Sequence, residues 1–158
     1  MATSTLIQYL EQSGVTGLGV SAPVGADASN RSQTETFLAG GTIAAGDFVS
    51  LDTSKTGANK ALFVVTVDTS AGAVALGVPT VGVALRDAAL GEKVDVCVAG
   101  FCAVANVVNG VAAGAAVALD TTTSGRATTA DAANVNIAAI CLTLAAGNKA
   151  EVMVLKRF

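Results

Sequence analysis

The chain contains no histidine and no tryptophan, and its only aromatic residues are five phenylalanines and one tyrosine. Without histidine, the Ser–His and Cys–His pairs of nucleophilic catalysis are excluded, and the commonest transition-metal ligand is missing. No glycine-rich phosphate-binding motif lies between an expected strand and an expected helix. The sequence therefore indicates a protein that is not an enzyme and that holds no metal and no cofactor.

Charged residues are also scarce, at 13% of the chain, and the formal net charge is −3. The nine basic residues are scattered, and only Lys156 and Arg157 are adjacent. A nucleic-acid groove or an anionic membrane surface calls for clustered Lys and Arg. We therefore expect neither nucleic acid nor a membrane as a partner.

The three cysteines, Cys97, Cys102 and Cys141, have neither the even count of a disulfide framework nor the close spacing of a zinc site. We interpret them as small buried apolar side chains with free thiols. The N-terminal segment has no basic residue before Arg31, so no secretory signal is recognisable. Both features fit a protein that assembles in the cytoplasm.

Small and β-branched residues make up much of the chain, with 32 alanines, 17 glycines, 22 valines and 17 threonines. Valine and threonine favour a pleated, half-buried surface, and the frequent glycines argue against long helices. A single-domain length of 158 residues leaves room for one sizeable core. That core must be thin, and it must be built mainly from valine.

An uncharged stretch from Val96 to Leu119 is long enough to cross a bilayer as a helix. However, Asn109-Gly110 is a strong tight-turn dipeptide, and Gly100 weakens a helix further. We therefore interpret the stretch as strand, turn, strand, turn, strand, and as uncharged because it is buried.

The sequence contains an internal duplication. The segment 43–57, "IAAGDFVSLDTSKTG", aligns without gaps with 111–125, "VAAGAAVALDTTTSG", and 81–98, "VGVALRDAALGEKVDVCV", aligns with 137–154, "IAAICLTLAAGNKAEVMV". In both copies glycines follow or precede runs that alternate apolar and polar residues, which is typical of turns between half-buried strands. We predict structural turns at Gly46, Gly91, Gly114 and Gly147.

The loop "LDTSKTG", with Asp52 and Lys55, has a superficial likeness to a phosphate or nucleophile loop. Its copy, "LDTTTSG", keeps the acid as Asp120 and has no lysine. A loop that occurs twice without its lysine is more typical of a turn in which the aspartate accepts hydrogen bonds from nearby backbone N–H groups. The residues thus offer no active site.

The expected fold class is all-β, as a compact barrel or sandwich over residues 37–158 that is built from two internal repeats, about 40–100 and 109–155. We expect residues 1–36 to form an extended N-terminal arm, because their composition is rich in Ser, Gly, Thr and Ala; the alternative is a tail without fixed structure. A short helix is expected at its start, where Thr5 and Gln8 fit a capping box. Such an arm orders only where a partner covers its apolar side chains, which are Leu6, Tyr9, Leu10, Val15, Leu18, Val20 and Val24.

The phrases "TIAAGDFVSLD", "VGVALRDAALGEKVDVCVAG", "VAAGAAVALDTTTSG" and "GNKAEVMVL" together resemble the small decoration, or cement, proteins of tailed-bacteriophage capsids. The resemblance covers roughly Gln33 to Leu155. It implies an all-β domain, often a homotrimer, on the outer surface of the assembled shell, where it fastens neighbouring subunits of the major capsid protein. The family brings no catalytic or cofactor residues.

Two other function classes stay open on the sequence alone. A tail or fibre component, or another surface binding module of a virion or cell, would also need contact surfaces rather than an active site. An enzyme would have to work with Asp, Lys and Ser only. The capsid-bound structural protein is the interpretation that the residues and the resemblance share.

Overall fold

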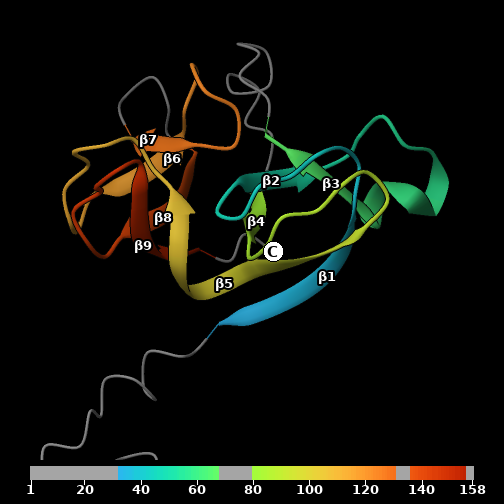
Figure 1. Cartoon of the computed structure of the whole chain (residues 1–158), viewed down its shortest axis with the longest axis horizontal. Helices are drawn as coiled ribbons and strands as arrows, with labels where there is room; N and C mark the ends of the chain where they lie inside the picture. Colours follow the sequence, from blue (N-terminus) through green and yellow to red (C-terminus); the bar gives the residue numbers. More distant parts are fainter. Residues whose placement is uncertain (1–31, 68–79, 131–135, 156–158) are drawn as a thin grey trace, which may run out of the picture. The chain divides into compact units, whose positions relative to one another are not determined.

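The computed structural model describes residues 32–67, 80–130 and 136–155, which form an all-β unit (Figure 1). This confirms the fold class. Residues 1–31 of the predicted arm, with Leu6, Tyr9 and the other apolar residues expected to contact a partner, lie outside the described residues. Residues 33–36, which the sequence assigned to the arm, belong to the first strand. The elements are β1 Gln33–Ala39, β2 Phe48–Leu51, the 3-10 helix η1 Gly57–Ala61, β3 Phe63–Thr66, β4 Thr80–Ala84, β5 Lys93–Asn106, β6 Ala116–Leu119, β7 Ala127–Thr129, β8 Ile137–Cys141 and β9 Lys149–Val154.

The first strands close into a small barrel. The order is β1-β3-β2-β4-β5, and β5 returns to pair with β1, so the ring has no free edge. All neighbours are antiparallel except β1 and β3, which are parallel at the pair Leu38 and Phe63. We call β1 to β4, with the first part of β5 (Lys93 to Val98), barrel 1.

The remaining strands repeat this order. The second part of β5 pairs with β9, and the order continues through β8, β6 and β7. A parallel bridge between Val107 and Ala127, beside the hydrogen bond from Val108 N–H to the Ala127 carbonyl (2.8 Å), brings β7 back to the end of β5. We call the second part of β5 (Gly100 to Asn106), with β6 to β9, barrel 2.

Strand β5 belongs to both barrels and runs along both of them in Figure 1. Its first part pairs with β1 and β4, and its second part pairs with β9. The sequence predicted a turn within this stretch, but the strand continues through Gly100, which has φ of +90°. Within the described residues, no helix is long and apolar enough to span a membrane. The charge-free stretch is instead made of β5, a loop and β6.

Pairing registers show that the duplication is longer than the sequence indicates. Leu38 pairs with Lys93 in barrel 1, as Asn106 pairs with Lys149 in barrel 2. The second part of β5 is therefore the counterpart of β1, although "QTETFLA" and "FCAVANV" share no residue. A register shift follows Val49 in the β2–β4 pair, and another follows its counterpart Val117 in the β6–β8 pair.

The gapless alignment of the second segments is wrong by one residue in β4 and β8. It set Val81 against Ile137, whereas the pairs Phe48–Val83 and Ala116–Ile140 make Val83 the counterpart of Ile140. The alignment failed because the following turns differ in length. Barrel 2 has a two-residue turn, Gly147 and Asn148, with φ of 57° and 60°. Two positive φ values define a type I′ hairpin, which needs one residue fewer than the turn around Gly91.

Two apolar clusters fill the molecule, and both are built mainly from valine and alanine as expected. One cluster fills barrel 1. The other fills barrel 2 and also takes in Phe48, Val83 and Cys97, which point out of barrel 1. The outer face of barrel 1 is thus covered by barrel 2, which explains why residues 32–158 form one compact unit.

Candidate functional site

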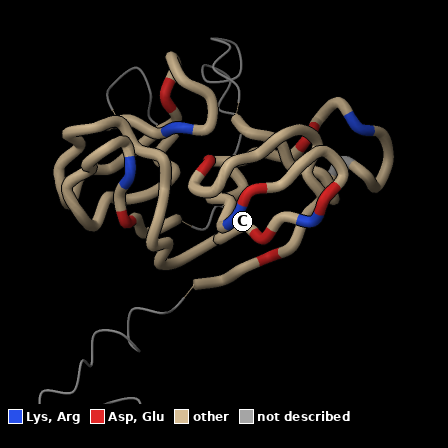
Figure 2. Tube along the Cα trace, viewed as in Figure 1, with Lys and Arg blue, Asp and Glu red and all other residues tan. Residues whose placement is uncertain are grey.

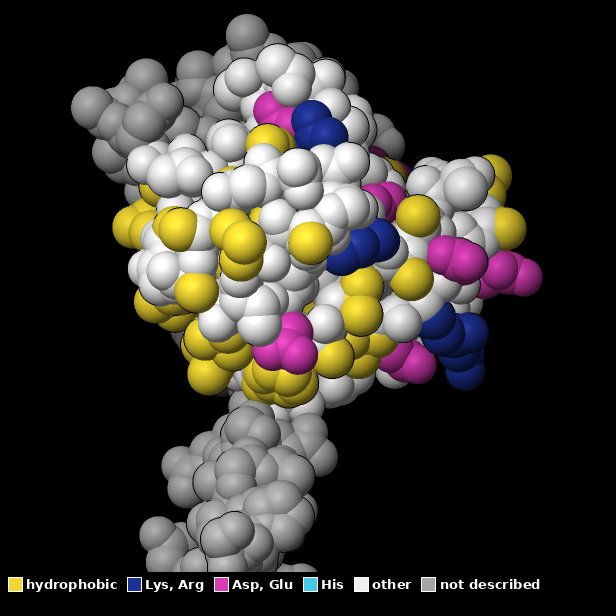
Figure 3. All heavy atoms as spheres, turned by 60° about the vertical axis from the view of Figure 1, so that its left-hand side comes forward, with side chains coloured by type: hydrophobic (Ala, Val, Ile, Leu, Met, Phe, Trp, Pro, Cys, Tyr) yellow, Lys and Arg dark blue, Asp and Glu magenta, His cyan; other side chains and the backbone are white. Residues whose placement is uncertain are grey.

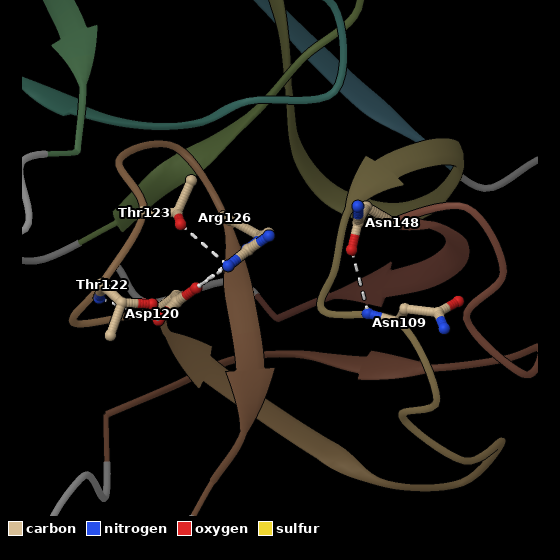
Figure 4. Close-up of polar contacts among 6 residues, drawn as sticks. All are labelled: Asn109, Asp120, Thr122, Thr123, Arg126 and Asn148. Carbon is tan, nitrogen blue, oxygen red and sulfur yellow. Dashed lines mark hydrogen bonds and ion pairs between the residues drawn. The ribbon is translucent and has the colours of Figure 1, made fainter.

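The two repeated aspartates build the same turn in each barrel. Asp52 Oδ1 accepts hydrogen bonds from the backbone N–H of Ser54 (3.0 Å) and from its hydroxyl (2.6 Å). Asp120 Oδ1 accepts the same two bonds from Thr122, at 2.9 and 2.7 Å (Figure 4). Both aspartates are buried. The interpretation of these loops as turns is therefore confirmed.

Each aspartate also has a cationic partner, but not the same one. Lys55 Nζ lies 3.6 Å from Asp52 Oδ2, and its side chain is one third exposed. Arg126 contacts Asp120 Oδ2 through Nη2 at 2.7 Å and Nε at 2.8 Å, and it also donates to the Thr123 hydroxyl (Figure 4). Both carboxylates are thus engaged within their own turns. Neither loop presents a carboxylate to a ligand.

These contacts change the acidity of both carboxyl groups. The hydroxyl and backbone N–H of Ser54, with Lys55 nearby, hold the pKa of Asp52 below its usual range, although burial acts the other way. For Asp120, burial raises the pKa, but the bonds from Thr122 and Arg126 together outweigh it and leave the pKa below its usual range. Both groups therefore stay ionised in the folded protein at neutral pH.

A polar joint connects the two barrels. Asp47, at the start of β2, accepts a hydrogen bond from the side-chain amide of Asn106 (2.6 Å), at the end of β5. Lys149 donates to the Asn106 side-chain oxygen and to the Ala45 carbonyl (3.1 Å). The Asn106 N–H also donates to the Gly46 carbonyl (2.8 Å). We call Asp47, Asn106 and Lys149 the barrel joint.

Gly125 is a second place where the backbones of the two barrels are in direct contact. Its carbonyl accepts from Phe48 N–H (2.8 Å), and its N–H donates to the Val67 carbonyl (3.0 Å). A Cβ at this position would lie 2.7 Å from atoms of Asp47 and Thr66. The glycine found in both copies has a different environment in barrel 1, where Gly57 is exposed and a Cβ would meet nothing within 4 Å.

A second polar contact ties two loops of barrel 2 together. Asn148 Oδ1 accepts from Asn109 N–H at 3.2 Å, and Asn109 Oδ1 accepts from Gly147 N–H at 3.2 Å (Figure 4). The dipeptide Asn109-Gly110, predicted as a turn, therefore holds the hairpin between β8 and β9. This contact joins the two loops and is structural.

The three cysteines are buried and free, as predicted. A hydrogen bond with the Cys102 thiol, together with burial, raises the pKa of Cys97. Burial also raises the pKa of Cys141. The raised pKa values make Cys97 and Cys141 poor nucleophiles, because the thiolate is the reactive form. The hydrogen bond with Cys97 lowers the pKa of Cys102 to about 7, but this thiol is buried.

A shallow hollow beside Thr42 and Ile43 carries two carboxylates, those of Asp87 and Glu92. Each carboxylate binds a backbone N–H of its surroundings, Asp87 to Ala45 (2.8 Å) and Glu92 to Ala89 (2.9 Å). Among residues 32–67, 80–130 and 136–155, no group of three or more His, Cys, Asp or Glu residues could hold a metal.

The four predicted turn glycines all have positive φ, at 91° for Gly46, 82° for Gly91, 83° for Gly114 and 57° for Gly147. Only Gly46 also lies against the barrel joint, where a Cβ would come within 3.1 Å of Asn106 Oδ1 and of Lys149 Nζ. At Gly114 and Gly91 a Cβ would meet open space.

Charge is distributed unevenly between the barrels. Acidic and basic residues lie mostly along barrel 1 (Figure 2). Figure 3, which brings barrel 2 forward, shows many hydrophobic side chains on this side and few charged ones. Among the exposed large hydrophobic residues of barrel 2 are Val104, Leu142 and Leu144, at 48%, 40% and 63% exposure. Sequence reasoning missed this apolar surface.

The fold and surface together define a class of protein: a pair of five-stranded barrels that share one strand, with Asp52 and Asp120 engaged in turns and with three buried thiols. No family model and no curated protein matches the chain. Among solved structures, the chain is similar to the N base of the head fiber gp8.5 of bacteriophage phi29. The TM-score is 0.52 at 11% sequence identity, over 78% of this chain and 94% of that one. At this identity the likeness shows a shared fold.

Substitution of the two equivalent glycines separates backbone strain from loss of the barrel joint. Gly114→Ala should lower the free energy of unfolding by about 1 kcal/mol, because alanine is strained at positive φ. Gly46→Ala should lower it by about 2 kcal/mol or more, because its Cβ also displaces Asn106 or Lys149. Urea unfolding followed by circular dichroism measures both. Equal losses in the two variants would contradict a structural role for the joint.

Replacement of the buried aspartate in barrel 2 should alter the pH dependence of stability. A carboxyl with a lowered folded pKa stabilises the protein above its unfolded pKa, and this contribution disappears as the pH falls through the folded pKa. Asp120→Asn should therefore cost about 1–3 kcal/mol at pH 7, and this cost should decrease as the pH falls below about 4, the usual pKa of an aspartate. Chemical unfolding at a series of pH values tests this.

The matched control is Asp52→Asn, because Asp52 builds the same turn with a more distant and more exposed cation. Its cost at pH 7 should be smaller. A constant difference between Asp120→Asn and the wild type from pH 7 to pH 3 would show that the charge of Asp120 does not contribute to stability.

Proposed function

We propose that this chain is a structural protein of a phage virion, which binds the outer surface of the assembled capsid and fastens neighbouring subunits of the major capsid protein. The observation that carries the proposal is the fold, which is similar over most of both chains to the base of a phage head fiber. The sequence resemblance to capsid decoration proteins points to the same location. The protein would assemble on the shell in the host cytoplasm.

The described surface fits a binding role better than a catalytic one. The buried aspartates are engaged within their turns, and the carboxylates of the hollow hold backbone N–H groups. Barrel 2 offers exposed apolar side chains on a rigid strand framework. A fastening protein needs several such contacts at once, because linked weak contacts raise the overall affinity without a single strong site.

The second candidate function is the base of a fibre or another surface binding module. The printed description of the similar structure favours it, since that protein is the base of a head fiber. A fibre base must attach to the shell, but it need not strengthen it. Protection of the shell therefore separates the two functions.

The first test is a comparison of purified shells with and without the protein. Bound protein should sediment with empty capsids, and coated capsids should release their contents at a higher temperature or at lower salt than bare ones. Binding without any gain in shell stability would favour the fibre base. Absence of binding to capsids, with the folded protein confirmed by circular dichroism, would contradict both.

The second test concerns the N-terminal arm. We propose that Leu6, Tyr9 and Leu10 and the apolar positions up to Val24 contact the capsid protein or a neighbouring copy. Deletion of residues 2–30 should leave the melting temperature unchanged, because the β unit begins at residue 32. The same deletion should remove most of the shell binding and protection. Full retention of both would move the fastening role to the barrels alone.

The third test concerns the number of copies. We propose a homotrimer, so light scattering at micromolar concentration should give about three times the 15.4 kDa of one chain. A thin core of alanine and valine gains stability from subunit contact, which should make the melting temperature rise with protein concentration. A monomer both in solution and on the shell would contradict this part of the proposal.

A further inference from the structure

The barrel joint brings an amine, an amide and a carboxylate into contact. Lys149 Nζ donates to Asn106 Oδ1, and Asn106 Nδ2 donates to Asp47 Oδ1 (2.6 Å). The amide of Asn106 is thus held at both ends, with the lysine on its oxygen and the aspartate on its nitrogen. An amine that can act as a nucleophile, an acyl carbon and a group that can transfer a proton are the components of an acyl transfer.

The sheet places the amine and the amide opposite each other. Asn106, at the end of β5, is paired with Lys149, at the start of β9, so both side chains lie on the same face of the sheet. The two residues are 43 positions apart in the chain, so the fold and not the local sequence brings them together. A second hydrogen bond, from Lys149 Nζ to the Ala45 carbonyl (3.1 Å), holds the amine in this place.

The carboxylate of Asp47 is fixed by its surroundings. Its Oδ2 accepts hydrogen bonds from the Ala44 N–H (3.0 Å) and from the Thr66 hydroxyl (3.3 Å), which leaves Oδ1 for the amide of Asn106. Asp47 and Asn106 are partly buried, whereas Lys149 is exposed. The reacting groups are therefore held in place, and a small product has a way out to the solvent.

Gly46 provides the space in which these groups meet. A Cβ at this position would lie 3.1 Å from Lys149 Nζ, 3.1 Å from Asn106 Oδ1 and 3.4 Å from Asn106 Cγ. Because Cγ is bonded to the oxygen that Lys149 contacts, the amine is close to the acyl carbon too. Such closeness in a fixed geometry favours a reaction between two groups that do not react when they are free in water.

We propose that Lys149 and Asn106 form an amide bond within the chain, with Asp47 as the catalytic acid and base. The Lys149 amine, after the loss of one proton, attacks Asn106 Cγ, and a bond forms between Nζ and Cγ. The bond between Cγ and Nδ2 breaks, and Asp47 delivers the proton with which Nδ2 leaves as ammonia. The ammonia takes up the proton that the amine lost. One amide replaces another, so nothing is oxidised or reduced.

The duplication provides an internal comparison. Lys93 is the counterpart of Lys149, but it is paired with Leu38 and has no amide opposite it. The position equivalent to Asp47 is Ala115, so the acid does not recur either. The other copy thus keeps the amine and lacks both of the groups with which it would react. We expect one such bond in the chain, at the barrel joint.

The bond connects the strand that both barrels share with the last strand of barrel 2. A covalent link between distant residues restricts the unfolded chain, in the way that a disulfide does, and keeps β5 and β9 together. It needs no oxidising compartment, because no thiol takes part. The inference goes beyond the proposed role on the capsid, since it concerns one chain by itself and is tested without a shell.

The test is mass spectrometry of the purified full chain. The intact mass should be lower, by one molecule of ammonia, than the mass expected without the bond. Trypsin does not cleave after a lysine whose amine is part of an amide, so the digest should contain residues 94–126 joined to residues 127–156. A chain without the bond gives the separate peptides 94–126, 127–149 and 150–156.

Three variants assign the loss of ammonia to this site. Lys149→Arg keeps a cation but removes the amine, and Asn106→Ala removes the acyl group, so both should have the full mass and no joined peptide. Asp47→Asn keeps an acceptor for the Asn106 amide but cannot transfer the proton, and it should slow the reaction at least roughly 100-fold. A time course of freshly purified protein measures this, and circular dichroism confirms that the variants are folded.

The matched controls are Lys93→Arg and Asn109→Ala, and both should retain the joined peptide. Lys93 has the equivalent position without an amide opposite it. Asn109 precedes Gly110, and an asparagine before glycine can also lose ammonia, by closing a ring between its side chain and the next backbone nitrogen. That reaction would leave the peptides 94–126 and 127–149 separate, and it would disappear in Asn109→Ala.

Three results would overturn the proposal. These are a full intact mass together with separate tryptic peptides, a joined peptide that persists in Lys149→Arg, and a loss of ammonia that is located at Asn109. Equal rates of formation in Asp47→Asn and in the wild type would overturn the role assigned to Asp47.

Discussion

Strand β5 is buried on both faces from Val96 to Val98, and the two-barrel arrangement depends on this. Val94, Val96 and Val98 point into the cluster of barrel 1, while Cys97 points into the cluster that fills barrel 2. Beyond Gly100 the same strand becomes the first strand of barrel 2. The barrels therefore cannot separate without breaking a continuous strand and exposing the row of Phe48, Val83 and Cys97. A charged side chain without a partner is unfavourable in a segment that is buried on both faces. This accounts for the absence of charge where the uncharged stretch begins, at Val96 to Val98.

The sequence predicted the duplication where backbone geometry restricts the residue type. Glycines at positive φ and aspartates that accept turn N–H groups recur because few other residues can replace them. It did not predict the first strand of each copy. "QTETFLA" lies mostly exposed on barrel 1, whereas "FCAVANV" is buried at three positions and reaches the barrel joint at Asn106, so the two segments meet different surroundings and keep no common residue. The one-residue slip between β4 and β8 has a similar origin, because turns of different length can join strands in the same register.

The candidate sites were predictable only where the two copies keep the same residue in the same turn. Comparison of the two loops at Asp52 and Asp120 was enough to recognise a turn, since the same chain keeps the acid and changes the cation. The row of partly buried apolar residues on the outer face of barrel 2 could not be recognised in this way. Ala116, Ile140 and Met153 come from three strands, and only the pairing registers place them side by side. Each is also unremarkable by itself, since single apolar residues occur on all protein surfaces.

In a chain of two repeats, the outer face of one repeat is covered by the other, and the equivalent face of the second repeat is not. In repeat proteins each unit covers its neighbour, and the terminal units need a polar outer face to remain separate. Barrel 1 meets its neighbour through charged groups as well as apolar ones, with Asp47 at the joint. Barrel 2 carries alanine at the equivalent Ala115, and Lys149 and Glu151 are the only charged residues on its strands. A terminal repeat without a polar cap leaves apolar side chains exposed, which fits the binding role that we propose.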